Sequence, residues 1–141
     1  MTTPIATPSD AIAAPLAALR VLLVDDDSFQ LEMISEILES LGVTHITTAG
    51  HGEQALQLIS GQAPFDLMLL DLNMPDMDGF KFMDSLTTVG YSGALIIVSG
   101  LSDDVLRAAT MVAQLRRFTL LGTVSKPVGI AALSPLLAKL G

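Results

Sequence analysis

The chain has 141 residues and no cysteine, half of its residues are hydrophobic, and its formal net charge is −8 at pH 7. This length suits one domain with a full core, and the lack of cysteine excludes disulfides and thiolate metal sites. Seven basic residues in an acidic chain also argue against the clustered lysines and arginines that bind nucleic-acid phosphates.

The N-terminal segment differs in composition from the rest of the chain. Residues 1–18 are rich in Ala, Thr and Pro, which predicts a loose tail before a domain of residues 19–141. The first ten residues carry an acid and no basic residue, unlike a signal peptide. The apolar stretch of residues 11–24 is broken by Pro15 and Arg20 and is too short to span a membrane. We therefore expect a cytoplasmic protein without a membrane segment.

Short apolar runs then alternate with segments of helical periodicity. Residues 21–24 form a continuous aliphatic run closed by three acids, the pattern of a buried parallel strand. Ser28 is the expected N-cap of a helix that Gly42 ends. The predicted strands are residues 21–24, 44–49, 65–70, 94–98 and 120–125. The later predicted helices are residues 53–60, 79–86, 103 to about 117, and 130–140.

Two of these helices carry predictions about their ends. Ser102 is expected to cap the helix that begins at Asp103, which has acids in its first turn and arginines in its last, as the helix dipole favours. Pro135 lies inside the last predicted helix. It should kink that helix, unless the helix begins near Ser134.

Five strands alternating with five helices predict an open, doubly wound α/β sheet with helices on both faces. Ligands of such sheets bind beyond the carboxyl ends of the strands. Polar residues stand at the ends of the first, third, fourth and fifth strands. They are Asp25, Asp26, Asp71, Ser99 and Lys126. These residues, far apart in the sequence, are therefore expected to converge at one edge of the sheet.

Three carboxylates at one edge would form a site of hard oxygen ligands, which suits Mg²⁺. Asp26 and Asp71 are the expected direct ligands, and Asp25 binds directly or through a water. A backbone carbonyl near Asn73 is expected to supply another oxygen. The sequence thus predicts a magnesium site.

The same residues predict phosphoryl transfer to an aspartate. A carboxylate and a phosphoryl group repel each other because both are anionic, and Mg²⁺ together with a cation such as Lys126 offsets that repulsion. The Ser99 hydroxyl can donate a hydrogen bond to a phosphoryl oxygen. A nucleophile, a metal, a cation and a hydroxyl donor are sufficient for this chemistry.

The motifs around these residues resemble those of response-regulator receiver domains over roughly residues 20–140. In chain order they are Leu23-Val24-Asp25-Asp26, then Asp71-Leu72-Asn73-Met74-Pro75 followed by Asp78-Gly79, then Val98-Ser99-Gly100, and finally Ser125-Lys126-Pro127. Each motif alone is weak evidence, but four in this order are strong evidence. The resemblance implies a flavodoxin-like, five-stranded parallel sheet of order 2-1-3-4-5.

The resemblance also implies a role for each residue. Asp71 accepts a phosphoryl group from a phosphohistidine, Asp25 and Asp26 hold Mg²⁺, Ser99 is the switch hydroxyl, and Lys126 contacts the acceptor and its phosphate. The domain is then a phosphorelay switch that takes part in its own phosphoryl transfer and hydrolysis, and not a metabolic enzyme.

Further implications concern conformation and partners. The Lys126–Pro127 peptide bond is expected to be cis, and phosphorylation is expected to change the surface formed by the last two helices and the strand between them. The implied partners are a sensor histidine kinase or phosphotransfer protein and an output domain or partner protein. A second copy in a homodimer is a further expectation, and none of these partners is a nucleic acid or a membrane.

Two features depart from the receiver pattern. Thr123 stands three residues before the lysine, where receivers often carry an aromatic switch residue, so the surface must respond by another route. The spacing from Ser99 to Lys126 is 27 residues (126 − 99), longer than is usual. Residues 93–101 and 121–127 are similar to receivers joined to EAL-type cyclic-di-GMP phosphodiesterase domains, which suggests a cyclic-di-GMP-related output.

An enzyme of the haloacid-dehalogenase-like phosphatase class is the main alternative. Asp25 and Asp27 could imitate its nucleophile and second acid. That class also needs metal-binding acids after its lysine, whereas residues 128–141 contain none, and Phe29 stands where a hydroxyl is expected.

Two further alternatives use the same fold. A degenerate receiver that only binds partners would be favoured if the acceptor, an acid or the lysine were missing, and none is missing. A flavin-binding protein would need a phosphate-cradling loop after the first strand, where three acids would repel phosphate.

Overall fold

The computed structural model describes residues 16–61, 64–74, 78–100 and 103–140. In these residues, five parallel strands form one sheet in the order β2-β1-β3-β4-β5. The strands are β1 (Arg20–Val24), β2 (His45–Ala49), β3 (Leu67–Asp71), β4 (Ala94–Ser99) and β5 (Thr119–Ser125). The helices are α2 (Ser28–Ser40), α3 (Gly52–Gly61), α4 (Gly79–Thr88), α5 (Asp103–Leu115) and α6 (Ile130–Ala138). The predicted strand order and the alternation of strands and helices are confirmed.

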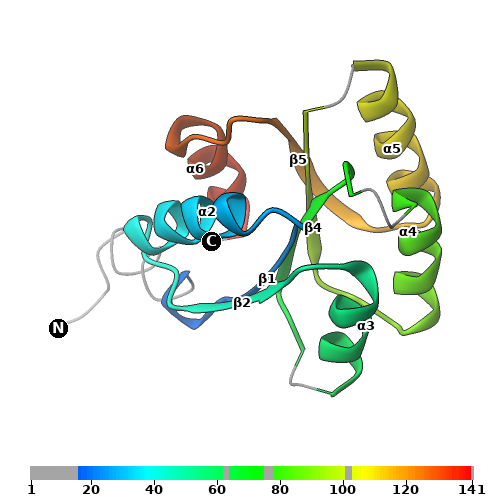
Figure 1. Cartoon of the computed structure of the whole chain (residues 1–141), viewed down its shortest axis with the longest axis horizontal. Helices are drawn as coiled ribbons and strands as arrows, with labels where there is room; N and C mark the ends of the chain where they lie inside the picture. Colours follow the sequence, from blue (N-terminus) through cyan, green and yellow to red (C-terminus); the bar gives the residue numbers. More distant parts are fainter. Residues whose placement is uncertain (1–15, 62–63, 75–77, 101–102, 141) are drawn as a thin grey trace, which may run out of the picture.

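Two layers of helices enclose the sheet. Helices α2 and α6 cover one face, and α3, α4 and α5 cover the other (Figure 1). Strands β3 and β4 lie inside the sheet and are buried along their whole length, which explains their unbroken aliphatic sequences. Successive residues face opposite layers, so Leu22 packs in the core below α4 while Leu23 packs in the core below α2. Each such fully buried side chain contributes about 1.5–3 kcal/mol.

The start of α2 differs from the prediction. Asp27 is the N-cap, because its Oδ1 accepts the N–H groups of Phe29 at 2.9 Å and Gln30 at 3.4 Å. Ser28, the predicted cap, is the first residue of the helix. Aspartate and serine cap helices about equally well, so composition alone could not separate them. The predicted end at Gly42 is confirmed by its φ of 105°, a left-handed conformation that glycine adopts without strain.

The last helix also differs from one of its two predictions. Helix α6 begins at Ile130 and continues through Pro135, so a start near Ser134 is wrong. Pro135 lacks the N–H that would bond to the carbonyl of Ala131. Ser102 and residues 1–15 lie outside the described residues. Residues 16–18, the end of the predicted tail, form a helical turn before β1.

A β-bulge in β5 fixes which side chains face each helix layer. Leu120 pairs with Leu95 and Gly122 pairs with Ile96, so Leu121 is one extra residue opposite β4. Lys139 Nζ donates to the Leu121 carbonyl at 2.8 Å and so satisfies the carbonyl of the extra residue. A Cβ on Gly122 would lie 2.7 Å from Leu136 Cδ2 of α6, and glycine avoids this clash.

After the bulge, the strand resumes its alternation. Val124 packs in the core beside α6, and Thr123 lies on the opposite face beside α5. Among the described helices, none combines the length and the apolar character needed to cross a bilayer.

Candidate functional site

The carboxyl ends of the central strands gather the acids that the sequence singled out. Asp25 follows β1 and Asp71 ends the adjacent β3, and these residues are only 3% and 2% exposed. Asp26 is exposed beside them. One carboxylate oxygen from each of Asp25, Asp26 and Asp71 lies within 4.8 Å of the other two. The structure therefore brings together the three predicted carboxylate ligands.

Lys126 reaches this cluster from the end of β5. Its Nζ lies 3.1 Å from Asp25 Oδ2 and 3.2 Å from Asp71 Oδ2. Its backbone N–H donates to the carbonyl of Ser99 at 3.0 Å, which continues the β4–β5 pairing up to the site. The predicted cis bond between Lys126 and Pro127 is present. One ammonium group thus bridges two buried carboxylates from different strands.

Ser99 completes the predicted set at the same edge of the sheet. It is fully buried at the end of β4 and pairs with Ser125 of β5. Its neighbour Val98 is the register partner of Asp71. Ser99 therefore lies on β4, between β3, which ends at Asp71, and β5, which Lys126 follows. Its role as a switch hydroxyl stays a prediction, as does the role of the Asn73 carbonyl.

Backbone hydrogen bonds orient the two buried carboxylates. The N–H of Asp27 donates to Asp25 Oδ1, and the N–H of Asn73 donates to Asp71 Oδ1, both at 2.9 Å. Asp25 Oδ2 is buried and makes an ion pair with Lys126, but it has no partner with hydrogen-bond geometry within the described part of the chain. This oxygen keeps acceptor capacity for a further ligand.

Burial and neighbouring charges set the protonation of the site. Burial raises the pKa of Asp71 above its ordinary value of 3.8, and the charge of Asp25 raises it further, although the N–H of Asn73 and the ammonium of Lys126 oppose the rise. Burial lowers the pKa of Lys126, but its contacts with Asp25 and Asp71 outweigh burial, and the pKa is raised from 10.5. The lysine is therefore held in its charged form.

The raised pKa of Asp71 predicts how stability depends on pH in protein freed of metal with EDTA. The folded state binds this proton more tightly than the unfolded state, so Asp71 lowers stability as the pH rises from its ordinary pKa through its raised one. Asp71→Asn removes this loss of stability. The free energy of unfolding of the variant should therefore exceed that of wild type by an amount that grows over this pH window and then levels off. Urea unfolding from about pH 4 to 7 measures it. Asp66→Asn is the matched control. A stability gain of Asp71→Asn that shrinks as the pH rises would contradict the predicted direction of the pH dependence.

Asp27 lies next to the cluster in sequence, but its side chain is used elsewhere. Its Oδ1 accepts two N–H groups at the start of α2, so it acts as a helix cap. The phosphatase alternative required Asp27 as a second acid in the site, and this geometry argues against it. The sequence did not predict that Lys126 also pairs with Asp25, because two residues after separate strands give no direct signal of a side-chain contact.

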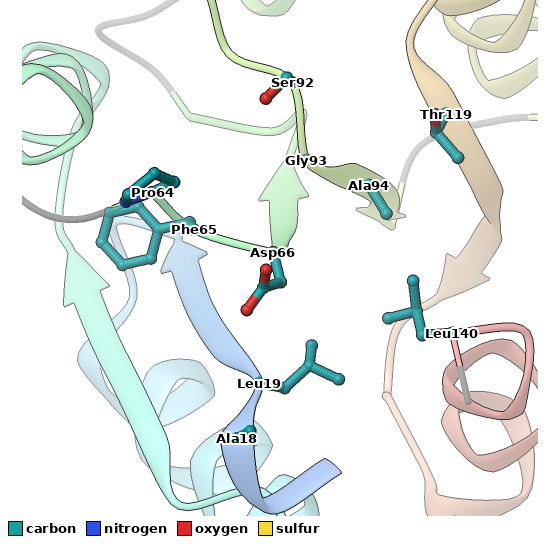
Figure 2. A pocket seen from close by; sticks show the side chains of 10 residues that line it. All are labelled: Ala18, Leu19, Pro64, Phe65, Asp66, Ser92, Gly93, Ala94, Thr119 and Leu140. Carbon is teal, nitrogen blue, oxygen red and sulfur yellow. The ribbon is translucent and has the colours of Figure 1, made fainter. Parts of the chain in front are cut away.

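A different hollow, of about 550 Å³, lies at the opposite, amino ends of the strands. Figure 2 shows its lining, in which Leu19, Phe65 and Leu140 surround the carboxylate of Asp66. Among the described residues that line this hollow, Asp66 is the only titratable one, and its Oδ2 accepts the backbone N–H of Arg20 at 2.9 Å. This hollow therefore lacks the convergent acids and the lysine that lie at the carboxyl ends of the strands. The carboxyl edge of the sheet remains the candidate site.

Comparisons with known proteins agree with this fold. The family model described as "Response regulator receiver domain" matches residues 21–137. A probable chemotaxis protein CheY of Rhizobium etli is 40% identical over 70 residues, which cover 50% of this chain and 54% of that protein. The signal transduction histidine-protein kinase BarA of Escherichia coli is 42% identical over 64 residues, which cover 45% of this chain and 7% of the kinase. The chain thus spans about half or less of the curated relatives it matches.

Solved structures match over most of the chain. A response regulator from Colwellia psychrerythraea has a TM-score of 0.73 and 30% identity, with 86% of this chain and 95% of that chain covered. A CheY-like receiver domain from Methylobacillus flagellatus has a TM-score of 0.72 and 27% identity, with 87% and 98% covered.

Proposed function

The chain belongs to the response-regulator receiver domain family, and from this membership we propose that Asp71 accepts a phosphoryl group from a histidine kinase or phosphotransfer protein. A receiver domain acts as a switch in a phosphorelay. The observation that carries the assignment to Asp71 is its position. It is buried at a strand end, within reach of two other carboxylates and 3.2 Å from the ammonium of Lys126.

The proposed transfer uses the side chains as they are placed. A carboxylate oxygen of Asp71 attacks phosphorus, a P–O bond forms, and the bond from phosphorus to the donor nitrogen breaks with its electron pair. The N–H of Asn73 holds one oxygen of Asp71 and so limits rotation of the carboxylate. Lys126 offsets the negative charge that gathers around Asp71 as the phosphoryl group approaches. Ser99 is proposed to donate to a phosphoryl oxygen once the group is attached.

The donor set fits Mg²⁺. Three carboxylates have oxygens within 4.8 Å of one another, and the buried Asp25 Oδ2 lacks a hydrogen-bond partner within the described residues. Hard oxygen ligands of this kind suit the ion. We propose that Asp25, Asp26, Asp71 and the backbone carbonyl of Asn73 hold it. When bound, Mg²⁺ would neutralise charge on the phosphoryl oxygens.

Magnesium binding should be visible as added stability. At 100 times its dissociation constant, Mg²⁺ should raise the free energy of unfolding by about 2.7 kcal/mol, because it binds only the folded site. Asp25→Asn should remove most of this gain, as measured by urea unfolding with and without Mg²⁺. Asp27→Asn is the matched control, because asparagine also caps helices and the Asp27 side chain caps α2 and is not part of the carboxylate cluster. Equal loss in both variants would place the ion elsewhere.

The proposed output involves the face formed by α5, β5 and α6. Thr123 lies on β5 and Lys126 directly follows this strand, so a change at the phosphorylated site has a direct path to this face. A cytoplasmic location, an output domain or partner related to cyclic-di-GMP, and a homodimer remain parts of the proposal. All the residues whose loss would have indicated a degenerate receiver are present at the site.

Acetyl phosphate provides a kinase-free test of this function. With Mg²⁺, the intact mass of the protein should rise by one phosphoryl group, and EDTA should prevent the rise. Turnover of a phosphomonoester without labelling of the protein would instead favour the phosphatase alternative.

A further inference from the structure

Helix α6 contacts β5 at its bulge, five residues (126 − 121) before the lysine of the candidate site. Lys139 is the C-cap residue of α6, and its Nζ donates to the carbonyl of Leu121 at 2.8 Å. A hydrogen bond from a charged donor is stronger than one between neutral groups. Leu133 and Leu137 anchor α6 in the core beside the sheet, so the helix presents this ammonium group from a defined position.

The bulge places two successive residues on the same side of β5. Leu121 is buried in the core beside α6, and a Cβ on Gly122 would also point at α6, 2.7 Å from Leu136 Cδ2. In a regular strand, successive side chains face opposite sides of the sheet. The extra residue therefore fits because the second of the two positions has no side chain. The alternation resumes one residue late, with Thr123 on the α5 side.

The extra residue sets how β5 is aligned with β4 at the candidate site. Before the bulge, Leu95 pairs with Leu120, an offset of 25 (120 − 95). After the bulge, Ser99 pairs with Ser125, an offset of 26 (125 − 99). If the first offset continued to the end of β5, Lys126 would lie about 3.3 Å further along the strand, and its side chain would start from the opposite face.

The contacts of Lys126 depend on this alignment because they are short. Its Nζ lies 3.1 Å from Asp25 Oδ2 and 3.2 Å from Asp71 Oδ2. Its backbone N–H donates to the carbonyl of Ser99 at 3.0 Å. A displacement of about 3.3 Å would break the backbone hydrogen bond, and the ammonium group could not keep both carboxylate contacts in the same side-chain conformation.

We propose that Lys139 is a positioning residue for phosphoryl transfer, which stabilises the bulge at Leu121 and thereby holds Lys126 between Asp25 and Asp71. Within the described residues, the ammonium group of Lys139 contacts the strand and none of the three carboxylates, so it acts through β5. The inference rests on the proposed function, in which Lys126 offsets the charge that gathers around Asp71. The C-terminal end of α6 thus controls the rate at which the acceptor is phosphorylated.

Lys139→Met tests the proposal, because methionine keeps a long side chain but has no donor. With acetyl phosphate and Mg²⁺, this variant should take up the phosphoryl group about tenfold more slowly than wild type. Lys139→Arg keeps a charged donor and should restore most of the rate. Thr44→Val is the matched control, because it removes another side-chain donor to a carbonyl, that of Ala17 at 2.8 Å, and should react at the wild-type rate.

A double variant separates positioning from a general loss of stability. If Lys139 acts through Lys126, then Lys139→Met should cause no further loss of rate in a Lys126→Ala background. A residue that only stabilises the fold would slow both backgrounds alike. Lys139 is exposed, so its substitution should leave the core intact, and circular dichroism checks the fold of each variant.

NMR of the unphosphorylated protein tests the bulge without phosphoryl transfer. In Lys139→Met, the amide signals of residues 123–126 should shift and their protons should exchange faster with solvent, whereas the signals of β1 should stay in place. If wild type takes up no phosphoryl group, the proposed function fails, and this measurement still decides whether Lys139 sets the alignment of β5.

Three results would overturn the inference. Wild-type uptake by Lys139→Met would remove its role in phosphoryl transfer, and unchanged amide signals after the bulge would show that β5 is held by other contacts. An equal loss of rate on Lys139→Met with and without Lys126, or no recovery in Lys139→Arg, would reduce Lys139 to a structural residue.

Discussion

Asp71→Asn should abolish phosphoryl incorporation from acetyl phosphate, a loss of at least about 10³-fold. The amide has the shape of the carboxylate and can still accept the N–H of Asn73, but it is not a nucleophile toward phosphorus. Lys126 keeps its ion pair with Asp25 at 3.1 Å, so the arrangement of the site should survive. Intact-mass measurement over time gives the rate.

The control for this variant removes a carboxylate from another part of the sheet. Asp66→Asn lies at the amino ends of the strands, in the hollow of Figure 2, and should be labelled as fast as wild type. If Asp71→Asn were labelled at the wild-type rate while Asp66→Asn behaved normally, another residue would be the acceptor.

Lys126→Ala should slow phosphorylation by about 10²-fold while leaving Mg²⁺ binding intact. The variant removes the one cation that lies within 3.2 Å of Asp25 Oδ2 and Asp71 Oδ2 in the described structure. Without it, the acids repel each other more strongly, so Mg²⁺ affinity should be unchanged or higher. Calorimetric titration measures the affinity, which suits a chain without tryptophan.

The same variant should separate phosphorylation from the response of α5 and β5. Any phosphorylated fraction should leave the NMR signals of these elements close to their unphosphorylated positions. Lys81→Ala, at an exposed lysine on α4, should behave as wild type in all three measurements. Loss of Mg²⁺ binding in folded Lys126→Ala would contradict the role given to the lysine.

Much of the fold could be predicted because each strand carries its own signal. The aliphatic run of β1 and its closing acids reflect burial on both faces and a strand end at the site, and the same holds for β3 with Asp71. The convergence of Asp25, Asp71 and Lys126 then follows from the parallel sheet, since carboxyl ends of parallel strands meet at one edge.

Other features depended on contacts that sequence patterns do not contain. Asp27 and Ser28 are both good helix caps, and only the backbone path shows that Asp27 does the capping. The extra residue at Leu121 lies where β5 packs near α6, and Lys139 Nζ donates to the carbonyl of Leu121, 18 residues earlier in the chain. The position of Thr123 on the α5 side of the sheet follows from that bulge, so a strand predicted only by its β-branched residues could not reveal it.

The position of the phosphoryl group is the most direct test of the central claim. After reaction with acetyl phosphate and Mg²⁺, reduction of the acyl phosphate with borohydride converts the modified aspartate to homoserine, which peptide mass spectrometry can locate. The conversion should be found at Asp71 in the peptide that contains β3. Conversion at Asp25, Asp26 or any other residue, with Asp71 unmodified, would contradict the account.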